Sequence, residues 1–188
     1  MPIRRRVSFE TIGSISAIVV ALASLFVAGD EARSVRRQQA ASVLPILKVQ
    51  TRSLNDSSER SVLIRVENVG VGPAFIDAGT IRWDGEPLGS VEDLRGRVQA
   101  IGGNASIWTA PLQGQVVGGG SGFDLFAATW TADAAGAGEA TLQAIRLVQE
   151  SVTIQTCYCS VYDDCWRTEM NRLGRPDHAS RCEAEAAP

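Results

Sequence analysis

The stretch SVLIRVENVGVGPA, residues 61–74, carries the pattern on which the predicted fold rests. In its first half, Ile64 and Val66 alternate with charged residues. Successive side chains of a strand point to opposite faces, so this alternation is typical of a half-buried β-strand. The segment ILKVQT, residues 46–51, has the same pattern. We predict two strands here, with residues 52–60 between them as a turn-rich connector.

The second half of this stretch predicts a structural turn. Gly70 and Gly72 can adopt positive φ, and Pro73 has no N–H to donate to a neighbouring strand. We expect Asn68, Gly70, Gly72 and Pro73 to form this turn between two strands.

The residues that follow alternate between strand-like runs and turn signals. Asp84-Gly85 suits a hairpin. The glycine-rich segment 114–122 is expected to be a flexible loop tip, because it lacks the Lys-Ser/Thr pair of a phosphate-binding loop. Further strands are predicted over residues 105–112, 122–130 and 151–162.

Two segments have helical features. Ser90, with Asp93 three residues later, resembles a capping box and predicts one helical turn. Within residues 138–150, the apolar residues Leu142, Ile145 and Val148 are spaced three apart. This repeat predicts an amphipathic helix, with a strand as the alternative.

Taken together, these elements predict a mainly β fold. Several short strands separated by turns, with one short helix, are typical of a small immunoglobulin-like β-sandwich. We expect this domain to occupy residues 45–182 and to be followed by a flexible tail over residues 183–188.

A separate apolar segment precedes the predicted domain. Residues 11–29 contain 19 residues without a charge, which as a helix cover roughly 28 Å, close to the thickness of the hydrocarbon core. A cleaved signal peptide is the alternative, but its apolar region is shorter. We therefore predict an uncleaved transmembrane signal anchor, a cytoplasmic N-terminus over residues 1–10 and a juxtamembrane helical stalk over residues 30–44.

The charges that flank the apolar segment bear on its orientation. Three arginines lie on each side of it: Arg4, Arg5 and Arg6 before it, and Arg33, Arg36 and Arg37 after it. The free amino terminus adds to the first group and favours an N-terminus inside. Lys48 is the only lysine, which suggests a GC-rich bacterial coding bias. We thus expect a single-pass protein of the bacterial inner membrane with its C-terminal domain in the periplasm.

Gly13, Ala17 and Ala21 recur every four residues in the apolar segment. Such a face lets two membrane helices approach closely, so it predicts a homo-oligomer formed through this helix. The alternative is that small residues are simply common in membrane spans.

Composition excludes several classes of function. A net charge of −3 argues against nucleic acid as a partner. His178 is the only histidine, so no mechanism that needs two imidazoles is available. Asp163, Asp164 and Asp177 lack the closely spaced loop of a calcium site. We predict no catalytic residues, no metal and no cofactor.

Four cysteines, Cys157, Cys159, Cys165 and Cys182, are the strongest candidate site. Strand alternation places Cys157 and Cys159 on one face, and a bridge between them would strain its geometry. In an oxidising compartment we expect one of them to bond Cys165 and the other Cys182. A zinc site with His178, a redox C-x-C dithiol and free buried thiols stay open as alternatives.

The four tryptophans are expected to pack in the core rather than to form an exposed binding platform. They are Trp83, Trp108, Trp130 and Trp166.

Two motifs carry a family resemblance. The turn ENVGVGPA, residues 67–74, and the stretch CYCSVYDDCW, residues 157–166, resemble a group of uncharacterised bacterial membrane-anchored proteins. In that group, one or two N-terminal membrane helices carry a small β-sandwich ectodomain. The resemblance implies this architecture for residues 45–182 and adds no catalytic residue.

These features predict a non-catalytic protein that acts by binding. We expect a membrane-anchored periplasmic scaffold, an accessory subunit of an envelope assembly with a protein partner in the envelope. One alternative is an envelope sensor or small-ligand binding domain in which residues 118–122 form a mobile rim. A third interpretation is a thiol oxidoreductase or metal-binding protein that uses the cysteine cluster, with Cys157 and Cys159 as the redox pair.

Overall fold

The chain forms two compact units, which are described separately below. They are Met1–Ser42 and Val43–Pro188. The computed structural model describes residues 9–56, 59–131 and 137–183. Most of the predicted N-terminal segment 1–10 and of the predicted tail 183–188 therefore lies outside the described residues.

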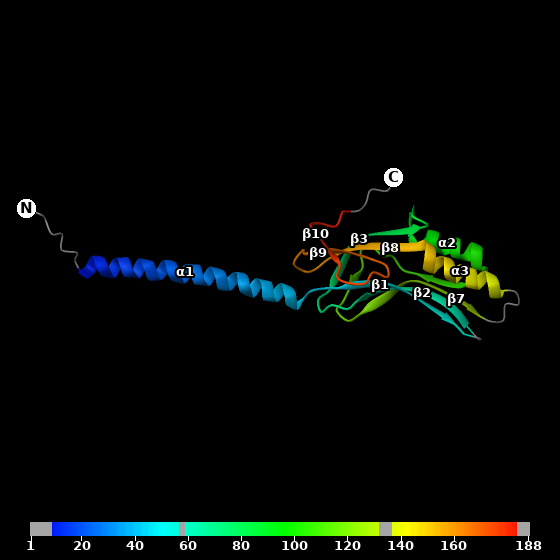
Figure 1. Cartoon of the computed structure of the whole chain (residues 1–188), viewed down its shortest axis with the longest axis horizontal. Coiled ribbons are helices and arrows are strands. Elements are labelled where there is room, and N and C mark those ends of the chain that lie inside the picture. The colour runs from blue at the N-terminus through cyan, green and yellow to red at the C-terminus, as the bar shows by residue number, and fades with distance from the viewer. Residues whose placement is uncertain (1–8, 57–58, 132–136, 184–188) are drawn as a thin grey trace, which may run out of the picture. The chain divides into compact units, whose positions relative to one another are not determined.

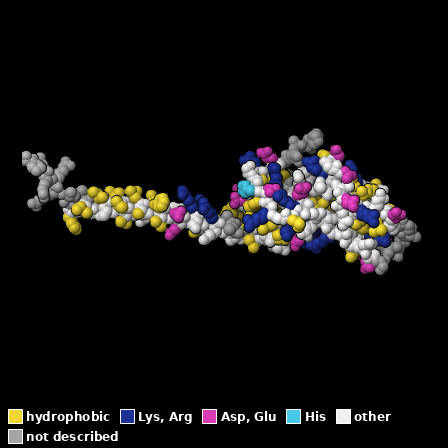
Figure 2. All heavy atoms as spheres, viewed as in Figure 1, with side chains coloured by type: hydrophobic (Ala, Val, Ile, Leu, Met, Phe, Trp, Pro, Cys, Tyr) yellow, Lys and Arg dark blue, Asp and Glu magenta, His cyan; other side chains and the backbone are white. Residues whose placement is uncertain are grey.

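The first unit is one helix, α1 (Phe9–Ser42). Its part Ile12–Gln39 is long and apolar enough to cross a membrane by length and composition. The hydroxyls of Ser16 and Ser24 donate hydrogen bonds to backbone carbonyls one turn earlier, so they are satisfied within the helix. Apolar side chains surround its first part and charged side chains follow (Figure 2). An N-terminal helix with the composition of a membrane span is confirmed.

The second unit contains two antiparallel sheets (Figure 1). The four-stranded sheet has the order β1 (Leu47–Asn55), β2 (Glu59–Asn68), β7 (Gly122–Thr131), β5 (Ser106–Thr109). The six-stranded sheet has the order β10 (Asp177–Ala179), β9 (Cys165–Glu169), β8 (Val152–Cys159), β3 (Ala74–Trp83), β4 (Glu86–Leu88), and β6 (Val116–Val117) also pairs with β3. The prediction of a mainly β domain is confirmed.

Two helices, α2 (Val91–Gly102) and α3 (Ala137–Ser151), pack against each other beside the sheets (Figure 1). The prediction of one short helix was wrong, because the turn expected at Ser90 continues for three turns. Asp93 accepts a hydrogen bond from the backbone N–H of Ser90 and starts α2. Buried Leu94, Val98 and Gly102 then recur every four residues, a helical spacing that sequence reasoning overlooked.

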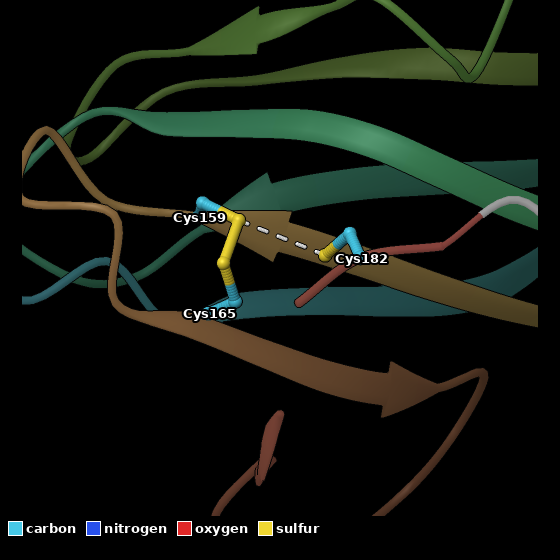
Figure 3. Close-up of side chains that lie close together, drawn as sticks. All are labelled: Cys159, Cys165 and Cys182. Atoms are coloured by element: carbon cyan, nitrogen blue, oxygen red, sulfur yellow. Dashed lines mark hydrogen bonds between the residues drawn. A yellow bond between two sulfur atoms is a disulfide. The ribbon is translucent and has the colours of Figure 1, made fainter. Parts of the chain in front are cut away.

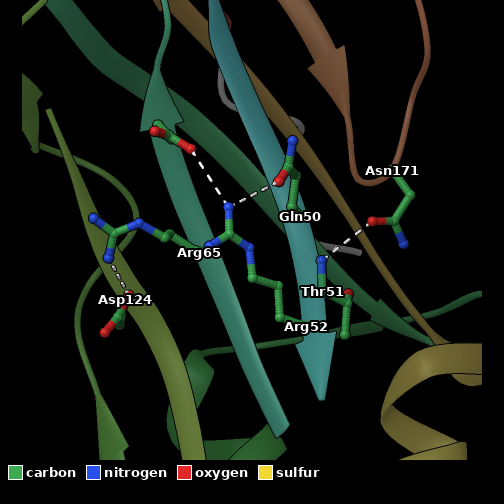
Figure 4. Close-up of polar contacts among 7 residues, drawn as sticks. Gln50, Thr51, Arg52, Arg65, Asp124 and Asn171 are labelled. Atoms are coloured by element: carbon green, nitrogen blue, oxygen red, sulfur yellow. Dashed lines mark hydrogen bonds and ion pairs between the residues drawn. The ribbon is translucent and has the colours of Figure 1, made fainter. Parts of the chain in front are cut away.

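Within the predicted connector over residues 52–60, residues 52–55 and 59–60 belong to strands, and residues 57–58 lie outside the described residues. Arg52 pairs with Leu63 and Asn55 with Arg60, so β1 and β2 form a long hairpin. The polar residues of these two strand segments belong to a sheet surface, and polar side chains on that surface bond one another (Figure 4). The Arg65 guanidinium, for example, lies 2.6 Å from the Asp124 carboxylate on β7.

Residues from both sheets and both helices form one hydrophobic core. Trp130 donates a hydrogen bond from its indole nitrogen to the carbonyl of Gly102, 2.9 Å away. A Cβ at Gly102 would lie 2.8 Å from that indole, which explains the glycine. Trp83 is also buried and Trp166 partly so, but Trp108 on β5 is 65% exposed. Core packing was therefore the wrong prediction for Trp108.

Candidate functional site

The cysteine cluster lies on the hairpin formed by β8 and β9. Antiparallel pairing places Cys159 directly opposite Cys165, and the two are joined by a disulfide with a Cα–Cα distance of 4.0 Å. The N–H of Ser160 donates to the carbonyl of Asp164 and closes the loop between the strands. Asp163 adopts a φ of 61°, which fits the turn-like character of the two aspartates.

A second disulfide joins Cys157 to Cys182, with a Cα–Cα distance of 5.5 Å. Cys157 and Cys159 lie on the outer face of β8, whereas Tyr158 between them points into the core. The bond attaches the chain after β10 to that outer face. All four cysteines are paired, with none left free.

The two disulfides are in contact. The Sγ of Cys182 lies 3.7 Å from the Sγ of Cys159 (Figure 3). The sulfurs of Cys159, Cys165 and Cys182 all lie within 4.8 Å of one another. Metals of the zinc type bind thiolates, so these cysteines could hold such an ion only after both bonds were reduced. His178 lies edge-on against Trp166, with a ring separation of 6.2 Å.

Tyr158 ties the inner face of β8 to the other sheet. Its hydroxyl accepts a hydrogen bond from the backbone N–H of Leu47 on β1, 3.2 Å away. Burial raises the pKa of the Tyr158 phenol, and the bond from Leu47 opposes that shift in part. The phenol ring also lies 5.9 Å from the ring of Trp166.

A polar groove of about 610 Å³ opens on the outer face of the six-stranded sheet. Its lining includes Cys157 and, directly opposite it on β9, Arg167. Arg172 and Asp177 form an ion pair at the same groove, with Nη2 2.9 Å from Oδ1. The hydrogen bond from Arg172 holds the pKa of the Asp177 carboxyl below its usual range, and the same contact raises the pKa of Arg172.

Asn68 organises the predicted structural turn. Its side-chain oxygen accepts from the N–H groups of Ile46 and Gly70, and its side-chain nitrogen donates to the carbonyls of Gly72 and Val117. The amide thus uses all four of its hydrogen-bonding positions while fully buried. It connects the first residues of the domain, the turn and the end of β6.

Two glycines of this turn allow the backbone of residues 43–46 to approach. A Cβ at Gly70 would overlap the carbonyl oxygen of Leu44, and a Cβ at Gly72 would overlap that of Val43. The N–H of Val71 also donates to Leu44 at 3.1 Å. Pro73 follows and precedes the first residue of β3. Close backbone packing, rather than positive φ, is therefore what excludes a side chain at Gly70 and Gly72.

The glycine-rich segment around residues 118–122 packs closely against this turn. The N–H of Asn68 donates to the carbonyl of Ser121, and the N–H of Gly120 donates to the carbonyl of Asn68. A Cβ at Gly119 would overlap the carbonyl oxygen of Val71. These bonds join the segment to the core of the domain.

The predicted packing face of the membrane helix lies on α1. Gly13, Ala17 and Ala21 are exposed, and a Cβ at Gly13 would meet nothing within 4 Å. The structure therefore leaves this face uncovered within the described chain. An oligomer formed through it stays a prediction.

Sequence reasoning missed the residues of the groove. Arg167, Arg172 and Asp177 come from two strands and the turn between them. Their proximity depends on the register of β8, β9 and β10, which no local pattern encodes. The exposed Trp108 was missed for a similar reason, since its exposure follows from the position of β5 at a sheet edge.

No family model matches the chain, and no curated protein has a similar sequence. The resemblance based on the motifs at residues 67–74 and 157–166 therefore stays a prediction.

Proposed function

We propose that this protein is a membrane-anchored binding module that presents its β domain on the periplasmic side of a bacterial inner membrane. It acts as a non-catalytic scaffold, an accessory subunit of an envelope assembly. The observation that carries the proposal is the combination of an apolar N-terminal helix with a domain in which all four cysteines form disulfides.

Disulfide bonds support the location of the domain. Such bonds persist in oxidising compartments and are rare in the bacterial cytoplasm. The flanking arginines leave the orientation of the helix nearly balanced, whereas two disulfides favour a domain outside the cytoplasm. The N-terminus would then lie inside the cell.

Strand order supports an immunoglobulin-like assignment for the domain. The order β1-β2-β7-β5 corresponds to strands A-B-E-D of that fold, and β9-β8-β3 corresponds to G-F-C. The helices α2 and α3 and the strands β4, β6 and β10 are additions to it. The disulfides differ from those of antibody domains, because they start from the F-like strand β8 and do not cross between sheets.

An exposed aromatic residue on a sheet edge supports binding of a protein partner. Trp108 is 65% exposed and lies on β5, the last strand of the four-stranded sheet. Edge strands offer unpaired backbone groups to a partner. Tryptophan is enriched among the interface residues that contribute most of the binding energy. We place the partner surface at this edge.

Labelling of thiols in intact cells tests the compartment. A membrane-impermeant maleimide should modify the four cysteines only after treatment with a reductant. Labelling without reduction would contradict the disulfides, and no labelling of intact cells after reduction would contradict the periplasmic location. A cysteine introduced at residue 5, before the helix, should stay unlabelled in both conditions.

Crosslinking tests the partner surface. A photoreactive amino acid in place of Trp108 should capture a protein of the envelope in living cells. The matched control is the same amino acid at Leu173, which is 96% exposed and lies in the connection between β9 and β10. Equal capture at both positions, or none at position 108, would contradict the proposal.

A second candidate function is favoured by the groove on the six-stranded sheet. Its volume of about 610 Å³ is in the range of small-ligand sites, and its lining carries both signs of charge. An envelope sensor would bind a polar small molecule there. Arg167→Ala should abolish such binding and leave crosslinking at position 108 unchanged.

A further inference from the structure

The contact between the two disulfides has a chemical consequence that does not depend on the proposed binding function. Cys157, Cys159 and Cys165 are 6%, 8% and 5% exposed, whereas Cys182 is only half-buried. The groove reaches Cys157, and neither Cys159 nor Cys165 belongs to its lining. An external thiol therefore meets the bond Cys157–Cys182 first.

We propose that the four cysteines form one disulfide-exchange unit, in which reduction of Cys157–Cys182 by a small thiol lets Cys182 bond Cys159 and release Cys165. The observation behind it is the 3.7 Å separation between the sulfurs of Cys182 and Cys159.

The first step is reduction at the groove. A thiolate attacks the Sγ of Cys182, the bond to Cys157 breaks, and the electron pair passes to the Sγ of Cys157. Arg167, opposite Cys157 and in the same groove, stabilises the negative charge of that thiolate. A second thiol then displaces Cys182 from the mixed disulfide. Overall, two external thiols become one external disulfide, and Cys157 and Cys182 each gain a hydrogen.

The second step is internal and needs no further reductant. The Cys182 thiolate attacks the Sγ of Cys159, the bond between Cys159 and Cys165 breaks, and the electron pair passes to Cys165. The number of disulfides is unchanged by this step. The protein then contains the bond Cys159–Cys182 and free thiols at Cys157 and Cys165.

The exchange moves a covalent constraint from one part of the domain to another. Before it, the bond Cys159–Cys165 closes the hairpin whose loop exposes Val161 and Tyr162. After it, the C-terminal segment is still attached to β8, but that hairpin has lost its disulfide. Thiols in the surroundings would thus loosen the tip of the hairpin without releasing the tail.

The variant Cys157→Ser of the full chain in detergent tests the second step, because it leaves Cys182 without its partner. The protein is incubated with reduced glutathione, acid-quenched, alkylated and digested with trypsin, which cleaves after Arg181. We expect the C-terminal peptide to be linked to Cys159 in a measurable fraction of molecules, with Cys165 alkylated in the same fraction. A C-terminal peptide that is alkylated in full would overturn the proposal.

The matched control is Cys182→Ser, which leaves Cys157 free instead. The three sulfurs that lie within 4.8 Å of one another do not include that of Cys157. Cys159–Cys165 should therefore remain intact in this variant. If Cys182→Ser lost the bond Cys159–Cys165 to the same extent as Cys157→Ser, a specific role of Cys182 would be contradicted.

The unchanged protein provides a test that does not depend on the folding of a variant. Reduction with increasing ratios of reduced to oxidised glutathione should populate a form with one disulfide and two thiols. We expect alkylated Cys157 and Cys165 in that form. Alkylation of Cys157 and Cys182 alone, or loss of both disulfides in one step, would overturn the exchange.

Discussion

The two segments at which the chain enters and leaves the β domain are fastened by different chemistry. Residues 43–46 are held by backbone hydrogen bonds to the turn after β2 and by the amide of Asn68. Residues 180–183 follow the last described strand and are joined to β8 by the bond Cys157–Cys182. The first attachment is non-covalent, and the second is covalent and lies on the outer face of the six-stranded sheet.

This difference reflects what each segment can pack against. Gly70 and Gly72 remove side chains from the turn, so the backbone of residues 43–46 comes close enough for direct hydrogen bonds. The C-terminal segment crosses the outer face of a sheet whose strands already pair with each other. A disulfide holds such a segment without any backbone partner. Three single and two double variants test this comparison, from the largest expected effect to the smallest.

Replacing Asn68 by alanine should have the largest effect. Four backbone groups would lose their partner at once, two of them buried and two part-buried, and each unsatisfied buried group costs about 1–3 kcal/mol. We expect the free energy of unfolding to fall by about 4 kcal/mol or more, measured by chemical denaturation of the full chain in detergent. Asn104→Ala, at an exposed position, should change it by less than about 0.5 kcal/mol.

Removing the bond of the C-terminal segment should cost somewhat less. The double variant Cys157→Ala with Cys182→Ala opens a loop of sequence separation 25, which by loop entropy costs about 3.5 kcal/mol. Cys159→Ala with Cys165→Ala opens a separation of 6 and should cost about 2 kcal/mol. If the variant without Cys159–Cys165 had the lower denaturation midpoint of the two, the hairpin would depend more on its disulfide than the tail does.

Tyr158→Phe tests the link between the two regions, because Tyr158 lies between the bonded cysteines and contacts Leu47. The buried N–H of Leu47 would lose its acceptor, at a cost of about 1–2 kcal/mol at neutral pH. The pKa of Tyr158 is raised in the folded state, so its contribution is present below the unfolded pKa near 10 and is lost as the pH rises through the folded pKa. Stability should therefore fall more steeply above about pH 10 in the unchanged protein than in the variant. Tyr162→Phe, at an exposed position, should keep the steep fall.

The smallest effect is expected for Asp177→Asn at the groove. The pKa of Asp177 is lowered by Arg172, so the ion pair stabilises the fold above the ordinary carboxyl pKa and is lost as the pH falls through the lowered value. The pair is exposed, and exposed pairs contribute little. The denaturation midpoint of the unchanged protein should drop slightly more than that of the variant below about pH 4. If the denaturation midpoints of the two proteins had the same dependence on acid pH, the turn between β9 and β10 would not depend on this ion pair.

Local sequence patterns predicted individual strands and helices, because the residues that form one such element follow each other in the sequence. Alternation at Ile64 and Val66 predicted β2, and both side chains are buried as a strand requires. The charge-free run over residues 11–29 predicted the apolar helix. The same reasoning failed for residues 52–60, because an exposed strand and a loop have similar polar composition.

The cysteine cluster also has features that the sequence predicted and a feature that it left open. Strand alternation alone puts Cys157 and Cys159 on one face. A disulfide between residues two apart on one strand would have strained geometry. The sequence left open which of them bonds Cys165. That choice follows from the register of β8 and β9, which sets Cys159 opposite Cys165 and leaves Cys157 to Cys182.

The sequence by itself thus determined an apolar helix, a mainly β domain and a shared face for the first two cysteines, because each depends only on the period of neighbouring residues. The tertiary structure alone decided that Arg167 lies opposite Cys157, that Trp108 is exposed at an edge, and that the Asn68 amide bonds the distant backbone groups of Ile46 and Val117. These depend on strand register and on the order of strands in a sheet. Both are set by contacts between residues far apart in the chain, where no local repeat exists.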